Sequence, residues 1–242
     1  MKLIDSHCHL YDMKKYTLPD EILPVVVGYS YSSNMKAVKI AKDKYPYVLG
    51  IAPQTAIKSD ISKLNEWVEY IRQNTPNAIG EVGLDYKWPT KKEEVEREIA
   101  VFKRMINLSK EMKLPLVIHS RNNPSDNNGM PKNAVRDILD MVNNNNILMH
   151  CYSGSEEEAK EIISMGGYIS IIPMRSKERK KVINTVPIDR LMVESDSPYI
   201  GRTPESIKDA IKYISEIKCI DFEEVATRTN ENAARFFGFD LS

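Results

Sequence analysis

Residues 3–9 read Leu-Ile-Asp-Ser-His-Cys-His, a short apolar run that ends in two histidines, His7 and His9. The chain has four histidines, and the other two, His119 and His150, also close short apolar runs. Apolar runs of this length between polar segments are typical of buried strands. We therefore expect several strands that each deliver an imidazole where the strand ends.

Two carboxylates hold the same position relative to apolar runs. Glu81 lies in the run Ala78–Leu84, and Asp196 follows the run that starts at Leu191. Packing alone seldom produces such a set, because buried charge is normally paired or bound to metal. Imidazole with carboxylate suits Zn, Mn, Fe or Mg better than a metal that prefers thiolates. The predicted metal ligands are His7, His9, Glu81, His119, His150 and Asp196.

Strand-like runs alternate with amphipathic helical stretches along the whole chain. The predicted strands are Leu3–Cys8, Leu23–Gly28, Tyr47–Ala52, Ala78–Leu84, Leu116–His119, Ile147–His150, Tyr168–Ile172 and Leu191–Ser195. The predicted helices are Asn34–Lys44, Ser59–Gln73, Lys91–Lys113, Lys132–Val142, Ser155–Met165, Arg175–Asn184, Pro204–Lys218 and Phe222–Phe237. Eight alternating pairs predict an α/β protein with a (β/α)8 TIM barrel, formed as a single domain over residues 1–242.

Caps and loops refine this prediction. Ser59 is a candidate N-cap, and Ser155 with Glu158 has the spacing of a capping box. The Asn-rich segment 122–129 follows a strand, so it is either a substrate loop on the active face or a plain solvated loop. The similar segment 143–146 follows a helix and is predicted to be a simple turn.

The composition limits the partners and the location. Thirty-four basic residues balance thirty-four acidic ones, so no overall charge attracts nucleic acid or membrane, and an anionic substrate must be held locally. Three widely spaced cysteines argue against a disulfide framework, and Cys8 and Cys151 fall out of phase with the histidines, as small apolar packing residues would. With no apolar run of membrane-spanning length, we expect a cytoplasmic protein without a membrane or obligate protein partner.

Barrel geometry makes these scattered residues neighbours, because all strands end at one rim. Side chains alternate along a strand, which puts Asp5 on the face of His7 and Glu194 on the face of Asp196. Metal-bound imidazoles usually donate their second N–H to a carboxylate or carbonyl group. Asp5 and Glu194 are therefore candidates to orient the histidines.

Six ligands suit two cations better than one. A bridging carboxylate can hold two ions roughly 3.5 to 4 Å apart, where they generate hydroxide and clamp the oxygens of a displacement reaction. Two divalent cations with two carboxylates and one hydroxide leave a positive surplus. This surplus favours a phosphate ester but leaves amides and lactones open as substrates.

Five motifs in this order resemble the TatD family of metal-dependent deoxyribonucleases. They are Asp5-Ser-His7-Cys-His9, Gly80-Glu81-Val-Gly-Leu-Asp85-Tyr86, Pro115-Leu-Val-Ile-His119-Ser-Arg121, His150-Cys-Tyr-Ser-Gly154 and Glu194-Ser-Asp196-Ser-Pro198-Tyr199. Together they run through almost the whole chain and are far more specific than an isolated His-x-His. The resemblance implies a TIM-barrel hydrolase with two divalent ions, Mg, Mn or Zn, that acts on DNA ends.

The resemblance also implies roles for the ligands. His7 and His9 would hold one metal ion, and His119 and His150 the other. Glu81 would bridge the two ions.

Catalysis and substrate binding would fall to further residues at the rim. Asp196 would bind metal and position or deprotonate the attacking water, which makes it, with Glu81, the predicted catalytic pair. Arg121 is a candidate for a charge-assisted bond to a phosphate oxygen, with a rim salt bridge as the alternative. Basic and aromatic residues near the rim could stack on a base and contact backbone phosphate, or they could simply pack over the edge of the barrel. They are Tyr86, Lys87, Trp88, Tyr152, Arg175, Lys177, Tyr199 and Arg202.

The chain departs from the family pattern in two places. The family commonly shows Gly-x-His-Pro-His after the third strand, whereas this chain has Gly50-Ile-Ala52-Pro53-Gln54 and lacks both histidines. The segment Gly201–Pro204 is also short, where many relatives carry a longer basic loop. These changes affect substrate handling and leave the metal ligands in place.

Three functions are therefore compatible with the sequence. The first is a phosphoesterase, most simply an exonuclease acting on DNA ends or a small phosphoester. The second is a barrel amidohydrolase or lactonase, which often uses a carboxylated lysine where Glu81 stands. The third is a catalytically weak binding module that the metal stabilises, which the missing rim histidines motivate.

Overall fold

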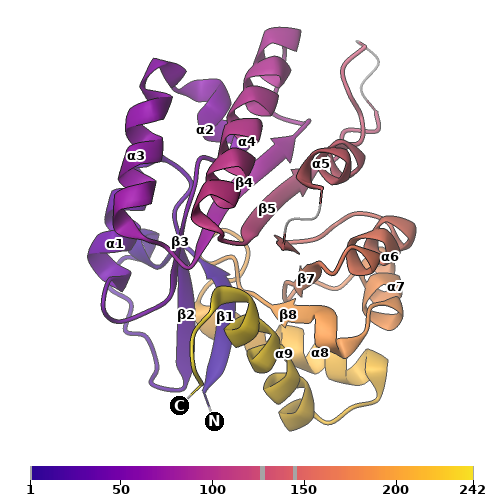
Figure 1. Cartoon of the computed structure of the whole chain (residues 1–242). Helices are drawn as coiled ribbons and strands as arrows, with labels where there is room; N and C mark the ends of the chain where they lie inside the picture. Colours follow the sequence, from indigo (N-terminus) through magenta and orange to yellow (C-terminus); the bar gives the residue numbers. More distant parts are fainter. Residues whose placement is uncertain (1, 126–128, 144–145, 242) are drawn as a thin grey trace.

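The computed structural model describes residues 2–125, 129–143 and 146–241. Eight parallel strands follow one another around a nearly closed barrel in the order β1 to β8, which confirms the predicted fold (Figure 1). The strands are β1 Leu3–Cys8, β2 Ile22–Val27, β3 Tyr47–Leu49, β4 Ala78–Asp85, β5 Leu116–Arg121, β6 Ile147–Met149, β7 Tyr168–Ile171 and β8 Leu191–Val193. The Asn-rich segments at 122–129 and 143–146 lie partly outside the described residues.

Helices form the outer layer of the barrel. They are α1 Tyr31–Ala41, α2 Pro53–Lys58, α3 Leu64–Asn74, α4 Lys92–Met112, α5 Ala134–Val142, α6 Glu156–Ser164, α7 Lys177–Thr185, α8 Ile207–Lys218 and α9 Phe222–Phe237. The described residues also form four short 3-10 turns, η1 Leu10–Asp12, η2 Ile61–Lys63, η3 Ile188–Arg190 and η4 Pro204–Ser206. No helix of the described part is long and apolar enough to cross a membrane.

The barrel has an apolar interior at its lower end. Inward-facing residues from all eight strands, among them Ile4, Val117 and Met192, form one buried cluster with Phe236 and Phe237 of α9. The other strand residues pack outward against the helices in a second, larger cluster. The helix α9 therefore closes the floor, at the end where β1 begins (Figure 1).

Register shifts in two strands decide which side chains face the interior higher up. In β1 the pairing with β2 shifts between Asp5 and Cys8, and in β4 the pairing with β5 shifts between Ile79 and Val82. An extra residue in a strand reverses the alternation beyond it. The interior face of β1 therefore changes from Ile4 below the shift to His7 above it.

The seam between β1 and β8 is closed largely by side chains. The Asp5 carboxylate accepts hydrogen bonds from the Ser195 backbone N–H (2.9 Å) and from the Ser195 hydroxyl, while the Ser6 hydroxyl donates to the Val193 carbonyl (2.9 Å). Higher up, the Asp196 N–H donates to the His7 carbonyl at 3.0 Å. These bonds join the first and last strands.

Several predicted boundaries differ from the structure. Ser59 ends α2 rather than starting the next helix, and Asp60 caps η2 instead through the Ser62 N–H. The short helix α2 was not predicted, because Ile51 and Ala52 extend the apolar run of β3 and the next predicted helix begins only at Ser59. The capping box of Ser155 and Glu158 is confirmed, with both hydrogen bonds present.

Both ends of the chain follow the predicted ranges, which place no helix between the first two strands and place Phe222–Phe237 last. Between β1 and β2 the chain forms only the turn η1, and α9 follows α8, so the helices are not paired one to one with the strands as eight pairs would require. Asn230 of α9 accepts a hydrogen bond from the Ile4 N–H (2.9 Å) and donates to the Lys2 carbonyl (2.7 Å). The last helix thus ties the floor to the first strand.

Candidate metal centre

A cavity of about 870 Å³ opens at the carboxyl ends of the strands. Five of the predicted ligands line it, namely His9, Glu81, His119, His150 and Asp196, and His7 lies beneath them with no exposed surface. The structure therefore brings together all six residues from five different strands or strand ends, as barrel geometry predicts.

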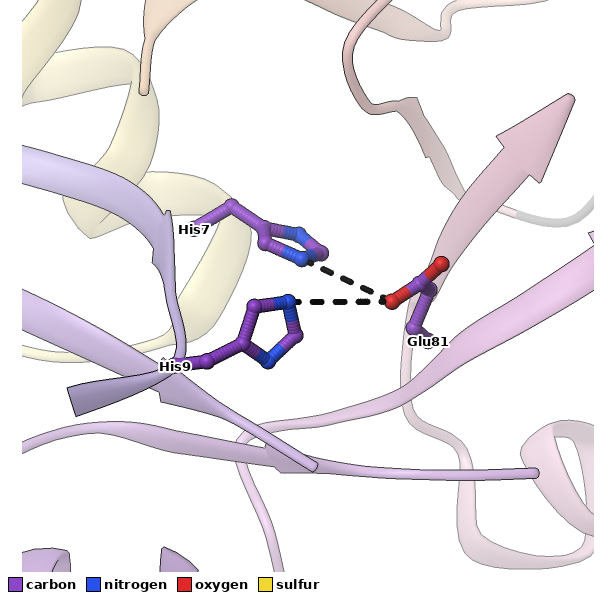
Figure 2. Close-up of side chains that lie close together, drawn as sticks. All are labelled: His7, His9 and Glu81. Carbon is purple, nitrogen blue, oxygen red and sulfur yellow. Dashed lines mark ion pairs between the residues drawn. The ribbon is translucent and has the colours of Figure 1, made fainter. Parts of the chain in front are cut away.

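The first group of ligands consists of His7, His9 and Glu81, whose metal-binding atoms lie close together. Figure 2 shows both imidazoles pointing toward the same carboxylate oxygen. The Nε2 atoms of His7 and His9 lie 3.8 and 3.9 Å from Glu81 Oε2. Asp196 Oδ1 adds a fourth donor, 3.4 Å from His9 Nε2 and 4.0 Å from His7 Nε2.

The second group consists of Glu81, His119 and His150. The other carboxylate oxygen of Glu81, Oε1, lies 3.2 Å from His119 Nδ1 and 3.5 Å from His150 Nε2. Glu81 therefore turns one oxygen toward each pair of histidines, which is the arrangement expected of a bridging carboxylate.

Polar partners hold the imidazoles in orientations that suit a metal site. His9 Nδ1 lies 2.8 Å from the Val27 carbonyl oxygen, so this nitrogen carries the proton and Nε2 is left as a free donor atom. His119 Nε2 lies 2.9 Å from Asp85 Oδ2, which leaves Nδ1 facing Glu81. Such contacts fix the tautomer of a metal ligand.

Glu194 takes the orienting position that the sequence predicts. Its Oε1 lies 3.4 Å from His150 Nδ1, and its carboxylate also accepts hydrogen bonds from the Cys151 N–H and, at 2.6 Å, from the Ser170 hydroxyl. These bonds fix the carboxylate behind the His150 ring. His7, His150 and Glu194 form a further group of close donor atoms, and the rings of His7 and His150 stack with centroids 4.0 Å apart.

His7 supplies the test of whether a cation fits here. Both of its ring nitrogens are buried and have no hydrogen-bond partner among the described residues. An unpaired buried polar atom is costly, and native structures seldom tolerate two on one side chain without a reason. The Nε2 atom faces Glu81 and Asp196, so a cation between them would satisfy it. The donor set, all imidazole and carboxylate, matches Zn, Mn or Mg.

The electrostatics of the centre follow from burial and mutual contact. Burial, aided by the neighbouring His150 and His9, lowers the pKa of His7 well below its usual value. Burial alone would raise the pKa of Glu81, but hydrogen bonds from His119 and His150 outweigh it and lower that pKa strongly. Burial is likewise overcome at His119, where Asp85 and Glu81 raise the pKa to about 9.

Asp5 and Tyr152 lie in positions that do not match their predicted roles. Asp5 bonds to the backbone of His7 (3.3 Å) and to Ser195, and its carboxylate touches no imidazole among the described residues. The register shift after Asp5 breaks the alternation that placed it on the face of His7. Asp5 therefore lies in the seam of the barrel rather than behind a metal ligand.

Tyr152 and Cys151 both point in directions opposite to those predicted: Cys151 lines the cavity and Tyr152 does not. Tyr152 was predicted to bind substrate, but it is buried, does not line the cavity, and donates its hydroxyl to the Ser155 carbonyl (2.8 Å). Cys151 lines the cavity although it was expected to point away. The chain turns at Cys151, whose φ is 47°, so strand alternation no longer applies after His150.

Arg121 reaches the cavity as predicted, and Asp85 holds it there. The Arg121 Nε donates to Asp85 Oδ1 at 2.8 Å, and its side chain remains 41% exposed. Asp85 therefore positions both His119 and Arg121, a role that the sequence analysis did not assign. The spacing of Glu81 and Asp85, both on one face of β4, could have indicated it.

Other rim residues divide into those that line the cavity and those that do not. Trp88 and Tyr199 line it, whereas Tyr86 is buried with its hydroxyl bonded to Asp137 (2.5 Å) and Arg175 pairs with Glu216 (2.6 Å) away from it. The cavity is also lined by residues that the sequence analysis did not select, including Tyr29, Lys58 and Arg179. Gln54, at the position of a missing histidine, lines it as well.

Known proteins resemble this chain over nearly its whole length. The TatD related DNase family matches residues 4–238. YabD of Bacillus subtilis, described as an uncharacterized metal-dependent hydrolase, is 29% identical over 265 residues that cover 97% of this chain and 98% of YabD. The human deoxyribonuclease TATDN3 is 26% identical, with 97% of this chain and 94% of TATDN3 covered. The crystal structure of the Escherichia coli TatD homologue YJJV superposes with a TM-score of 0.80 at 20% identity and covers 98% of both chains.

Proposed function

The chain belongs to the TatD-related DNase family of metal-dependent hydrolases, and on this premise we propose that it is an exonuclease that removes nucleotides from DNA ends with two divalent cations. The observation that carries the proposal is the position of Glu81, whose two oxygens face two separate pairs of histidines. One cation would be held by His7, His9 and Asp196, and the other by His119 and His150.

The residues of the cavity divide the work of hydrolysis among them. Cations bound here would polarise a phosphate oxygen and lower the pKa of a water molecule. Asp196, beside His9 and at the cavity wall, orients the attacking water and accepts its proton. The water oxygen then bonds to phosphorus as the bond between phosphorus and the ester oxygen breaks, and the leaving oxygen takes up the proton that Asp196 accepted. Arg121, held by Asp85, donates to a phosphate oxygen of the bound strand.

The charge of the site suits a phosphodiester. Two divalent cations exceed the charge of Glu81 and Asp196, and the Asp85 charge is already paired with Arg121. A singly charged phosphodiester with the attacking hydroxide compensates the surplus, whereas a neutral amide or lactone leaves it in place. This argument ranks the phosphoesterase above the amidohydrolase or lactonase.

The proposal is tested with end-labelled single-stranded DNA and Mg, Mn or Zn. We expect the parent protein to shorten the strand stepwise, and the Asp196→Asn variant to lose at least about 100-fold in rate because its proton acceptor is gone. Asp43→Asn is the matched control, since Asp43 is exposed in the loop between α1 and β3, outside the cavity. Its rate should equal that of the parent.

Each of the other outcomes selects another function. Turnover by Asp196→Asn at the rate of the parent contradicts the assigned role of this carboxylate. If amides or lactones are hydrolysed faster than any nucleotide ester, the protein is an amidohydrolase or lactonase. If DNA is cut at internal bonds, the protein is an endonuclease and not an exonuclease. If no ester is cleaved under any cation while chelation still lowers the melting temperature, the metal-stabilised binding module is correct.

A further inference from the structure

We infer that Gln54, Lys58, Trp88 and Arg121 form a second subsite, which binds the nucleotide next to the scissile bond through its base and its phosphate. The inference rests on the proposed function and specifies its substrate as a strand of at least two nucleotides. All four residues line the same cavity as the metal ligands. They come from α2, from the segment after β4 and from the end of β5.

Trp88 is the centre of this subsite. It is one of the few large apolar side chains that the described surface exposes, with 42% of its area accessible, and it forms part of the cavity wall. Lys58 Nζ lies 4.2 Å from the centre of its ring, and Arg121 Cζ lies 5.5 Å from it. An aromatic ring flanked by two cations is the combination that binds a base by stacking and a backbone phosphate by charge.

The two positively charged side chains beside Trp88, those of Lys58 and Arg121, remain available for a ligand. Among the described residues no carboxylate lies within ion-pair distance of Lys58, and Lys58 is exposed. Arg121 uses its Nε to bond Asp85, and its terminal nitrogens have no partner in the described part of the chain. A guanidinium held through Nε presents these nitrogens in a fixed direction, which suits a phosphate.

Gln54 adds a polar group that is otherwise unexplained. Its Oε1 atom is buried and has no hydrogen-bond partner among the described residues. Gln54 and Lys58 are four residues apart on α2, so one face of this helix presents both to the cavity. This oxygen would be satisfied by a donor on the base or the sugar of the bound nucleotide.

The subsite is directly connected to the metal centre. Arg121 bonds to Asp85 at 2.8 Å, Asp85 bonds to His119 at 2.9 Å, and His119 lies 3.2 Å from Glu81. Only two side chains therefore separate the guanidinium from the bridging carboxylate. A phosphate at Arg121 and a second phosphate at the metal centre would be neighbours along one strand.

The test measures binding without hydrolysis, with the cations removed by a chelator. The chain has two tryptophans, and Trp67 is buried, so a Trp67→Phe background leaves Trp88 as the fluorescent probe. In this background we titrate thymidine 3′,5′-bisphosphate and thymidine. We expect both to change the emission of Trp88, and the bisphosphate to bind at least about fivefold more tightly because charged hydrogen bonds are strong.

Substitutions at Lys58 provide the decisive comparison. Lys58→Gln should remove most of the preference for the bisphosphate, and Lys58→Arg should retain it. Lys63→Gln is the matched control, since Lys63 is exposed on η2 and does not line the cavity. The inference is overturned if neither ligand changes the fluorescence emission of Trp88. It is also overturned if Lys58→Gln binds the bisphosphate as tightly as the parent does.

The outcome is separable from that of the proposed function. Failure of the same preparation to shorten end-labelled DNA under any cation would contradict the exonuclease, whereas the binding titration does not depend on turnover. A protein that cleaves DNA but does not distinguish the two ligands would retain the proposed function and lose the second subsite.

Discussion

At the scale of single residues, Asp85 has the widest effect on the site. One carboxylate oxygen faces His119 and the other faces Arg121, so the same side chain orients a candidate metal ligand and the residue proposed to donate hydrogen bonds to phosphate. Hydrogen bonds from His119 and Arg121 outweigh burial and lower the pKa of Asp85. The charged form that both partners require is therefore favoured.

Replacement of Asp85 by asparagine should weaken metal binding by about 10- to 100-fold, because one amide oxygen cannot serve both partners. Competition between the protein and a chromophoric chelator for Zn or Mn measures this without any substrate. Asp43→Asn makes the same chemical change at an exposed position and should bind metal like the parent. Parent-like affinity in Asp85→Asn would show that His119 needs no orienting carboxylate.

A second residue, Glu98 of α4, makes stability depend on pH. Glu98 is buried beneath Asp85, accepts only a long bond from the Asp85 N–H (3.4 Å), and keeps its Oε1 without a partner among the described residues. Burial raises its pKa from 4.5 to about 8. Between these values the unfolded chain releases a proton that the folded protein keeps, so stability falls as pH rises.

Glu98→Gln has no proton to lose and should gain stability relative to the parent as pH rises from 5 to 8. We expect a relative gain of at least about 1 kcal/mol, since each unit of pKa difference is worth about 1.4 kcal/mol. Urea unfolding at several pH values in a chelator measures it. The exposed Glu66→Gln should follow the parent. A difference between Glu98→Gln and the parent that is constant with pH contradicts the raised pKa.

The candidate metal ligands could be selected at this scale because each lies in or just after an apolar run, and the structure brings all of them together. Lys58 could not be predicted, since nothing in its neighbours distinguishes it from any other exposed lysine. Its position depends on where α2 lies relative to Trp88. Tyr152 was assigned to the substrate for its residue type, whereas its burial depends on the turn at Cys151.

At the scale of elements, the order of the strands and of most helices was predictable, but the helix α2 and the inward faces of two strands were not. Hydrophobic alternation identifies a strand, yet a register shift of one residue reverses it, and both β1 and β4 carry such a shift. The shift in β1 explains why Asp5 and His7 serve different purposes. In contrast, Val117 and His119 of β5 keep simple alternation between floor and site.

The helix α9 is the element on which the barrel floor depends. Phe236 is buried among residues of the barrel interior and stacks edge to face with Tyr168 at a centroid distance of 5.6 Å. Phe236→Ala should reduce the free energy of unfolding by about 3–5 kcal/mol, as expected for a buried phenyl ring. Urea denaturation compares it with Phe222→Ala at the half-buried start of α9. If both variants lose the same free energy of unfolding, stability does not depend more on the barrel floor than on the start of α9.

At the scale of the whole molecule, the candidate metal centre joins strands from opposite sides of the barrel. Its donors come from β1, β4 and β5 and from the segments that follow β1, β6 and β8. Anything that binds only the folded state stabilises it, by about 2.7 kcal/mol at a concentration 100 times its dissociation constant. Cations should therefore stabilise the entire barrel and not only its rim.

Removal of cations should lower the melting temperature of the parent, and stepwise addition of Zn or Mn should raise it again. Thermal unfolding followed by circular dichroism measures the shift. The Asp196→Asn variant loses one charged donor and should show a smaller shift at equal cation concentration. A melting temperature that is independent of cation concentration would contradict tight binding at this centre.

The seam between β1 and β8 has a consequence for how the protein is made. Asp5 and Ser195, which clasp the seam, are separated by most of the chain, as are His9 and Asp196. A ribosome therefore exposes the first two imidazoles long before the carboxylate that completes their donor set has been translated. Until then the nascent chain holds only part of the donor set, so a cation that needs all of these donors would be fully bound only after the eighth strand docks against the first.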